Sequence, residues 1–96
     1  MLFALICTDK PGHLQVRLDN RPAHVEFLNG LGDALKAAGP FLDEAEKPNG
    51  SLVVIEAADL QEAQGIAARD PYALAGLFDD VQIKPWNWVF KAPNAA

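Results

Sequence analysis

The sequence contains one cysteine, two histidines and only eight lysines and arginines among its 96 residues. The single cysteine, Cys7, excludes an intrachain disulfide framework and a zinc site built from several cysteines. Thirteen acidic residues give a formal net charge of −5, which argues against a surface that neutralises nucleic-acid phosphates. No apolar run reaches the roughly 18 residues of a membrane-spanning helix. We therefore expect neither a nucleic acid nor a membrane as partner.

Motifs for several reactions are also missing. The chain has no glycine-rich phosphate loop and no His-Glu-x-x-His zinc motif, so we expect no cofactor and no metal. No basic residues precede the first apolar run, which argues against a signal peptide and predicts a cytoplasmic location. Half of the residues are hydrophobic, enough for a core. The length predicts one domain over residues 1–90, followed by a tail over residues 91–96.

Turn and capping residues divide the chain into elements. Asn20 and Pro22 are typical of a helix start, although the helix could begin slightly earlier, and Gly39-Pro40 is typical of a helix end. Asn49-Gly50 predicts a hairpin turn, and Asp59 predicts the N-cap of a second helix. The predicted strands cover residues 2–7, 41–47, 51–57 and 81–90. The predicted helices run from about 20 to 38 and over 60–68, with a further helical segment over 72–78. A loop over 8–17 and a turn over 48–50 connect them.

This order predicts an α+β fold with the ferredoxin-like βαββαβ arrangement, an antiparallel sheet with both helices on one face. The strands over residues 2–7 and 51–57 are apolar on both faces, but two helices can cover only one face. We therefore expect a homodimer in which a second copy covers the other face. The alternative is a monomer in which residues 72–78 and the tail cover it.

His24 lies in the middle of the apolar face of the first predicted helix when residues are placed at 100° intervals. One interpretation is a core histidine that hydrogen-bonds a backbone carbonyl. The other is a general acid or base in a cleft between helix and sheet. The residues alone leave these interpretations evenly balanced.

Asp70 and Arg21 also allow two interpretations each. Asp70 precedes a proline, which is typical of a helix N-cap, but its carboxylate could also bind His24 and fix the tautomer of the ring. Arg21 lies one helical turn before His24, either as a solvent-reaching side chain or as a group that binds a ligand anion.

Other polar and aromatic residues carry weaker signals. Ser51 is typical of a turn serine, and Tyr72 and Trp86 are typical of core or interface aromatics, although at least one aromatic residue could line a pocket. Cys7, inside an apolar strand, is typical of a structural thiol.

The sequence resembles the YCII-related (YciI-like) family over roughly residues 1–90. The resemblance rests on the following segments: Arg21-Pro22-Ala23-His24, Leu35 to Gly39, Gly50-Ser51, Asp70-Pro71-Tyr72, Ala75-Gly76-Leu77 and Trp86. It implies a dimeric α+β barrel with a site built on His24 and Asp70. A dehydrochlorinase of a chlorinated hydroxyquinol is known within the family.

Three hypotheses for function follow. In the first, His24 and Asp70 are catalytic residues for proton abstraction or elimination on a small molecule, with Arg21, Ser51, Tyr72 and Trp86 as ligand-binding residues. In the second, the same pocket only binds a small ligand. In the third, the His24–Asp70 pair is a buried hydrogen bond that stabilises the fold.

Overall fold

The computed structural model describes residues 1–93. Four strands form one antiparallel sheet in the order β2-β3-β1-β4, with β1 over Leu2–Asp9, β2 over Leu35–Leu42, β3 over Pro48–Glu56 and β4 over Phe78–Trp86. The helices are α1 (Leu14–Gly30), the short 3-10 turn η1 (Gly32–Ala34), α2 (Leu60–Arg69) and α3 (Pro71–Leu74). The predicted ferredoxin-like α+β fold is confirmed. Of the predicted tail, residues 94–96 lie outside the described residues.

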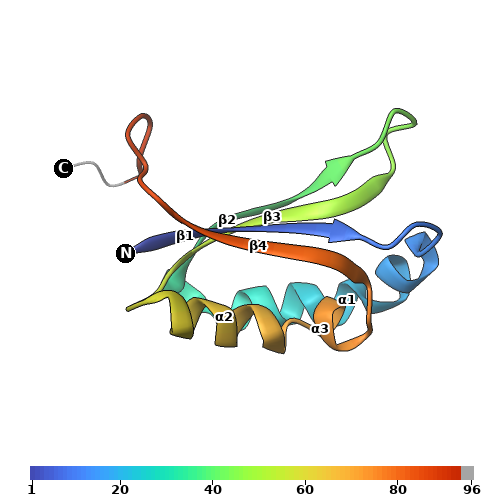
Figure 1. Ribbon diagram of the computed structural model, residues 1–96, viewed down its shortest axis with the longest axis horizontal. Helices are drawn as coiled ribbons and strands as arrows, with labels where there is room; N and C mark the ends of the chain where they lie inside the picture. The colour runs from blue at the N-terminus through green and yellow to red at the C-terminus, as the bar shows by residue number, and fades with distance from the viewer. Residues whose placement is uncertain (94–96) are drawn as a thin grey trace.

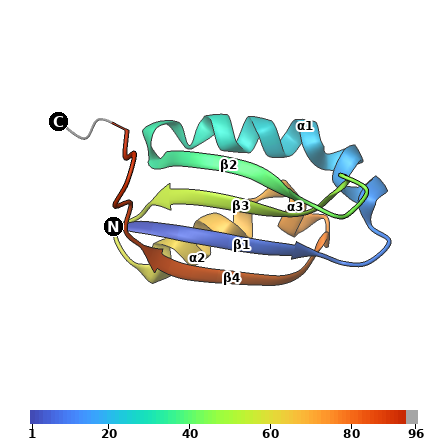
Figure 2. The ribbon, with the colours of Figure 1, turned by 90° about the horizontal axis from the view of Figure 1, so that it is seen from above.

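All three α-helices lie on one face of the sheet (Figure 1). The core lies between that face and the helices, and alternate residues of β1 and β3 supply much of it. Its buried members are Phe3, Leu5, Cys7, Val53, Ile55, Ala57, Ala63 and Ile66. Seen from above, α1 runs along the β2 edge and α2 lies under β1 and β4 (Figure 2). No helix within residues 1–93 combines the length and apolarity needed to cross a membrane.

The predicted boundaries of the first helix were wrong at both ends. α1 begins at Leu14 and contains Pro22 in its interior, whereas the sequence placed that proline in the first turn. Asn20 is no N-cap, because its side chain donates to the carbonyl of Val16 over 2.8 Å. The proline is tolerated because it lies on the exposed side of the helix, where the carbonyl that loses its partner can bind water.

The second predicted strand and the predicted turn were also misplaced. Gly39-Pro40, expected to end the helix, lies inside β2, an edge strand where proline is tolerated. Asn49-Gly50 lies in β3. The hairpin turn instead spans residues 43–47, where Asp43 Oδ1 accepts hydrogen bonds from the backbone N–H groups of Ala45 and Lys47 at 2.8 and 3.0 Å.

The second half of the chain follows the prediction more closely. α2 begins after Asp59, whose Oδ1 accepts from the N–H of Glu62 at 2.9 Å, so the predicted N-cap is confirmed. α3 ends at Leu74, short of the predicted segment. β4 covers Phe78–Trp86 rather than residues 81–90. Its partner strand begins at Leu2, which pairs with Trp86, so the residues after Trp86 have no strand to pair with.

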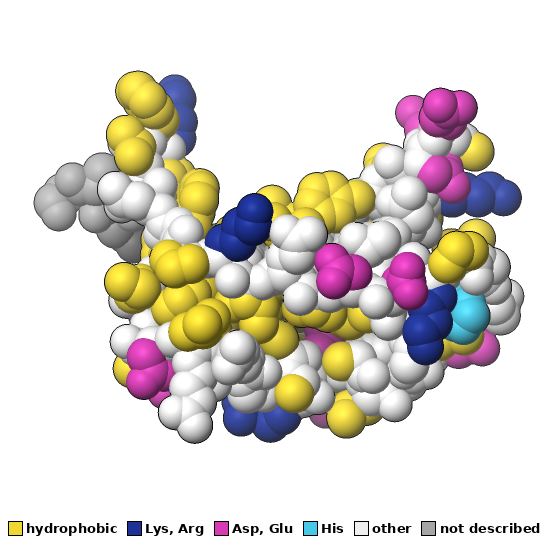
Figure 3. Space-filling view, viewed as in Figure 1, with side chains coloured by type: hydrophobic (Ala, Val, Ile, Leu, Met, Phe, Trp, Pro, Cys, Tyr) yellow, Lys and Arg dark blue, Asp and Glu magenta, His cyan; other side chains and the backbone are white. Residues whose placement is uncertain are grey.

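The second face of the sheet carries apolar side chains that no described helix covers. Strand alternation places Leu2, Ala4 and Ile6 of β1 on this open face, with Leu52 and Val54 of β3 beside them. The segment over residues 72–78 lies on the helix side, so it does not cover the open face (Figure 1). The β2–β3 hairpin and residues 87–93 rise at opposite ends of the sheet, with hydrophobic side chains gathered in the hollow between them (Figure 3).

Candidate functional site

His24 of α1 and Asp70, just before α3, lie within hydrogen-bonding distance of each other. The ring Nδ1 of His24 is 2.9 Å from Oδ1 and 3.0 Å from Oδ2 of Asp70. Both residues are buried, with exposed fractions of 8% and 6%. The residues alone left this contact open, since they lie 46 positions apart, and the family resemblance favoured it.

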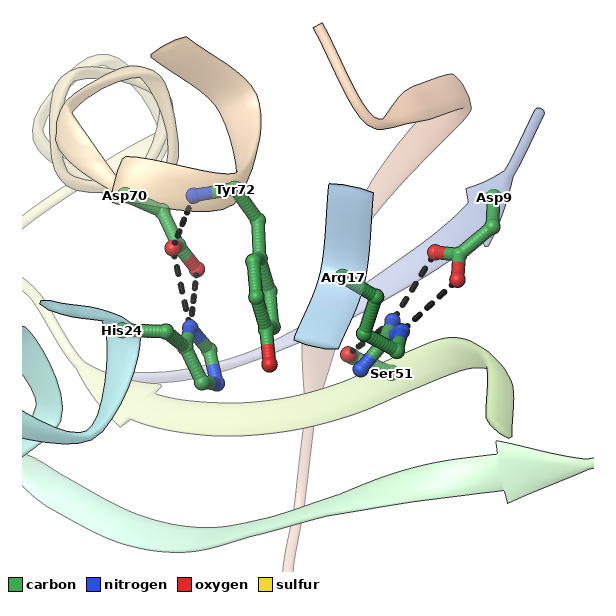
Figure 4. Close-up of polar contacts among 6 residues, drawn as sticks. All are labelled: Asp9, Arg17, His24, Ser51, Asp70 and Tyr72. Atoms are coloured by element: carbon green, nitrogen blue, oxygen red, sulfur yellow. Dashed lines mark hydrogen bonds and ion pairs between the residues drawn. The ribbon is translucent and has the colours of Figure 1, made fainter. Parts of the chain in front are cut away.

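Asp70 has both of the roles that the sequence left open, the N-cap of a helix and the partner of His24. Its Oδ1 accepts a hydrogen bond from the backbone N–H of Tyr72 at 2.9 Å, so it caps the four-residue helix α3. The same carboxylate contacts Nδ1 of His24, as Figure 4 shows. A carboxylate only accepts hydrogen bonds, so Nδ1 of the neutral ring carries the proton and Nε2 keeps a free lone pair.

Tyr72 lies between His24 and Arg17. The rings of Tyr72 and His24 stack, with centroids 3.9 Å apart and planes inclined by 16°. On the other side, the guanidinium carbon of Arg17 lies 4.6 Å from the centroid of the Tyr72 ring. Burial raises the pKa of the Tyr72 hydroxyl, and the charges of Arg17 and Arg21 oppose that rise. The order Arg17, Tyr72, His24 is visible in Figure 4.

Arg17 is the site residue that sequence reasoning missed. Its Nε donates to Asp9 Oδ2 at 2.7 Å, and its Nη2 donates to Asp9 Oδ1 at 2.8 Å and to Ser51 Oγ at 2.9 Å. Burial alone would lower the pKa of Arg17, but the hydrogen bonds and charge of Asp9 outweigh it and raise that pKa. The signal was present in the sequence: on a helix that begins at Leu14, Arg17, Arg21 and His24 share one face.

A pocket of about 320 Å³ lies beside these residues, between α1 and the helix-facing side of β2 and β3. Its lining includes four of the predicted site residues, namely Arg21, His24, Ser51 and Tyr72, together with Arg17. Arg21 is exposed, whereas Ser51 is buried and held by Arg17. The remaining lining residues are Leu18, Val25, Leu28, Ala38, Gly39, Pro40, Pro48 and Val53.

Trp86, predicted as a ligand-binding residue, lies away from this pocket. It pairs with Leu2 at the far end of β1, is 41% exposed and packs against Trp88 with ring centroids 5.4 Å apart. A larger hollow of about 650 Å³ near this end contains Trp88. Its only charged lining residues, Asp33 and Lys36, are exposed, so it lacks a buried acid–base group.

Metal binding and thiol chemistry are the alternatives to a histidine base. Within residues 1–93, no three His, Cys, Asp or Glu side chains lie close enough together to hold a metal ion. Cys7 is buried in β1, and burial raises the pKa of its thiol to about 12. A thiol in that state is a poor nucleophile at neutral pH.

The family model of the YCII-related domain matches residues 1–87 of the chain. The chain belongs to the YCII-related family. Protein YciI of Escherichia coli is 38% identical to this YCII-related chain, over 94% of the chain and all of the relative. An uncharacterised protein of Haemophilus influenzae is 36% identical over the same shares.

Solved structures agree with this assignment of the YCII-related chain. The 5-chloro-2-hydroxyhydroquinone dehydrochlorinase TftG of Burkholderia phenoliruptrix, in complex with 2,5-dihydroxybenzoquinone, is 34% identical, with a TM-score of 0.83. The likeness covers 91% of this chain and 94% of TftG. An antibiotic biosynthesis monooxygenase is 17% identical, with a TM-score of 0.57. The match covers 93% of this chain and 99% of the monooxygenase chain, and it shows a shared fold alone.

Proposed function

We propose that the chain is a cofactor-independent enzyme that moves a proton on a small organic molecule, with Nε2 of His24 as the general base or acid. One observation carries the proposal: Asp70 holds Nδ1 of a buried histidine at 2.9 and 3.0 Å while that histidine lines a pocket. The contact leaves Nε2 free for a ligand, and a fixed tautomer is what a general base needs.

Asp70 and Tyr72 act on His24 as positioning residues in this proposal. The Asp70 carboxylate stabilises the imidazolium that forms when Nε2 takes a proton. The stacked Tyr72 ring restricts rotation of the imidazole about its side-chain bonds. Both come from one short segment, so the helix α3 that Asp70 caps also positions the base.

The pocket size supports a small substrate. About 320 Å³ is at the lower end of the range for small-molecule sites, and most of the lining is apolar. The relative TftG eliminates the elements of hydrogen chloride from a hydroxylated aromatic ring, as its name states. An elimination needs a base for the proton and lets the leaving group depart as an anion, which suits a lone pair on His24 Nε2.

We also propose that the protein is a homodimer in the cytoplasm, with the open sheet faces of two copies packed together. The apolar residues Leu2, Ile6 and Leu52 on that face support the pairing, since monomers rarely leave a contiguous apolar sheet face in water. The free thiol of Cys7 suits a reducing compartment.

The test uses 5-chloro-2-hydroxyhydroquinone under anaerobic conditions and measures released chloride. We expect the wild-type protein to release chloride faster than His24→Ala, with near-ultraviolet circular dichroism showing that the variant is folded. Equal rates in the two proteins would refute the catalytic role of His24. If neither releases chloride but the wild type binds 2,5-dihydroxybenzoquinone, the alternative of a non-catalytic binding module is favoured for this ligand class.

A further inference from the structure

We propose that Arg17 is the receptor for an anionic oxygen of the ligand, so that the pocket beside His24 selects small anions with an apolar body. This inference rests on the proposed function, because it names the class of molecule that reaches His24. Arg17 would bind and orient the ligand and would exchange no proton with it.

The charge of the pocket lining is opposite to that of the whole protein. The chain carries a formal net charge of −5, yet Arg17 and Arg21 line the pocket and no aspartate or glutamate does. Arg21 forms no ion pair with a carboxylate in residues 1–93, so its charge is uncompensated. A cleft of one charge sign with apolar walls concentrates ligands of the opposite sign.

The hydrogen bonds of Arg17 leave one end of its guanidinium for the pocket. Nε and both N–H groups of Nη2 are accounted for by Asp9 and Ser51, and the Tyr72 hydroxyl also lies within reach of the guanidinium, which leaves at least one donor of Nη1. Figure 4 shows that Nη1 lies on the side away from Asp9. Three fixed hydrogen bonds on a residue with 4% exposure hold this donor in place before any ligand arrives.

The placement of Arg17 also suits the chemistry at His24. The guanidinium and the imidazole lie on opposite faces of the same Tyr72 ring, and both side chains line one pocket. An oxyanion bound at Nη1 would place the rest of a small ligand near Nε2. A fixed donor beside the base also stabilises negative charge that develops when a proton is removed.

The experiment compares two probes of equal shape, 4-nitrobenzoate and its uncharged counterpart 4-nitrobenzamide, by titration followed with NMR. We expect the wild type to bind the anion at least about tenfold more tightly, the difference that one charge-assisted hydrogen bond makes. Similar dissociation constants for the two probes would overturn the proposal.

The decisive variant is the double substitution Asp9→Asn with Arg17→Gln, which removes one charge of each sign and leaves the net charge of the protein unchanged. We expect the Kd of 4-nitrobenzoate to rise at least about tenfold and that of 4-nitrobenzamide to stay within about twofold. Arg69→Gln at the end of α2, outside the pocket lining, is the control for general electrostatics. An equal loss in Arg69→Gln would overturn the proposal.

If the double variant does not fold, Arg17→Lys provides the test, because it keeps the charge beside Asp9 but has no second nitrogen to face the pocket. Anion binding as tight as in the wild type would then refute the role of Arg17. Chloride release separates this inference from the proposed function. Loss of anion preference with His24-dependent turnover intact refutes only the role of Arg17, whereas His24-independent turnover refutes only the proposed function.

Discussion

Replacing Asp70 by asparagine removes one charge from the site while keeping the shape of the side chain. Asparagine caps helices about as well as aspartate, so Oδ1 can still accept from the Tyr72 N–H over the 2.9 Å seen now. The amide nitrogen then faces Nδ1 of His24 and donates to it. This donation makes Nδ1 the acceptor in place of its 2.9 Å contact with Oδ1, and the ring proton then moves to Nε2. Asp70→Asn therefore removes the lone pair that faces the pocket.

The size of the effect follows from the contacts that are lost. A hydrogen bond to a charged group contributes about 1.5–3 kcal/mol and a neutral one about 0.5–1.5, so the free energy of unfolding should fall by about 1–2 kcal/mol. Asp70→Ala also loses the cap of α3, which costs about 1 kcal/mol more. In serine proteases the wrong tautomer at a histidine–carboxylate pair costs roughly 10⁴-fold in kcat, and we expect a loss of chloride release of that order.

The assay is ¹⁵N NMR of the histidine rings at about pH 8.5, where imidazole is ordinarily neutral. His13→Gln removes the signals of the other histidine, whose Nδ1 contacts the carbonyl of Pro11 at 2.9 Å. Wild-type His24 should show a protonated Nδ1, and Asp70→Asn should show a protonated Nε2. An Asp70→Asn protein that keeps the proton on Nδ1 would refute the reasoning, as would a variant with unchanged urea stability.

The remaining predictions concern the fold and its assembly. The pKa of the Cys7 thiol is about 12 in the folded protein, against the ordinary value of 9.0 that applies to the unfolded chain. The free energy of unfolding therefore falls as the pH rises above 9. Urea unfolding should show a loss of about 1.4 kcal/mol by pH 10 that Cys7→Ala lacks. A Cβ at Gly50 would lie 2.5 Å from the carbonyl oxygen of Cys7, whereas one at Gly39 meets nothing within 4 Å. Thermal melts should therefore show Gly50→Ala destabilised by about 1–3 kcal/mol and Gly39→Ala nearly unchanged; equal effects would contradict this account. Ile6→Lys on the open face should turn a dimer into a folded monomer by light scattering, and a persisting dimer would count against the proposed interface.

The sequence placed His24 correctly on an apolar face even though the helix boundaries were wrong. The helical wheel uses only the spacing between residues, so a shift of both ends does not move His24 relative to Leu28 and Leu31. The Gly39-Pro40 pair was a stronger stop signal than Gly32, which has a positive φ of 58° at the start of η1, just after α1. Apolar residues after Gly32 continue at helical spacing by coincidence, and pairing with β3 decides their conformation.

Arg17 and Trp86 show what local patterns leave open. Arg17 was assigned to a loop because Pro22 predicted a later helix start, and its burial depends on Asp9, which only the folded chain brings close. The sequence pattern of the last strand does not show where on the sheet Trp86 lies. The register of β4 against β1 decides it, and that register is a tertiary property.

The backbone amide of Tyr72 gives a reporter of ligand binding that needs no knowledge of the reaction. This amide donates a hydrogen bond to the Asp70 carboxylate. It can therefore exchange with deuterium only when the N-terminus of α3 opens and releases His24. A ligand that requires the closed arrangement slows this exchange in proportion to its occupancy. A compound collection could thus be screened by hydrogen exchange at one amide, and the compounds that protect Tyr72 would be the first candidate substrates.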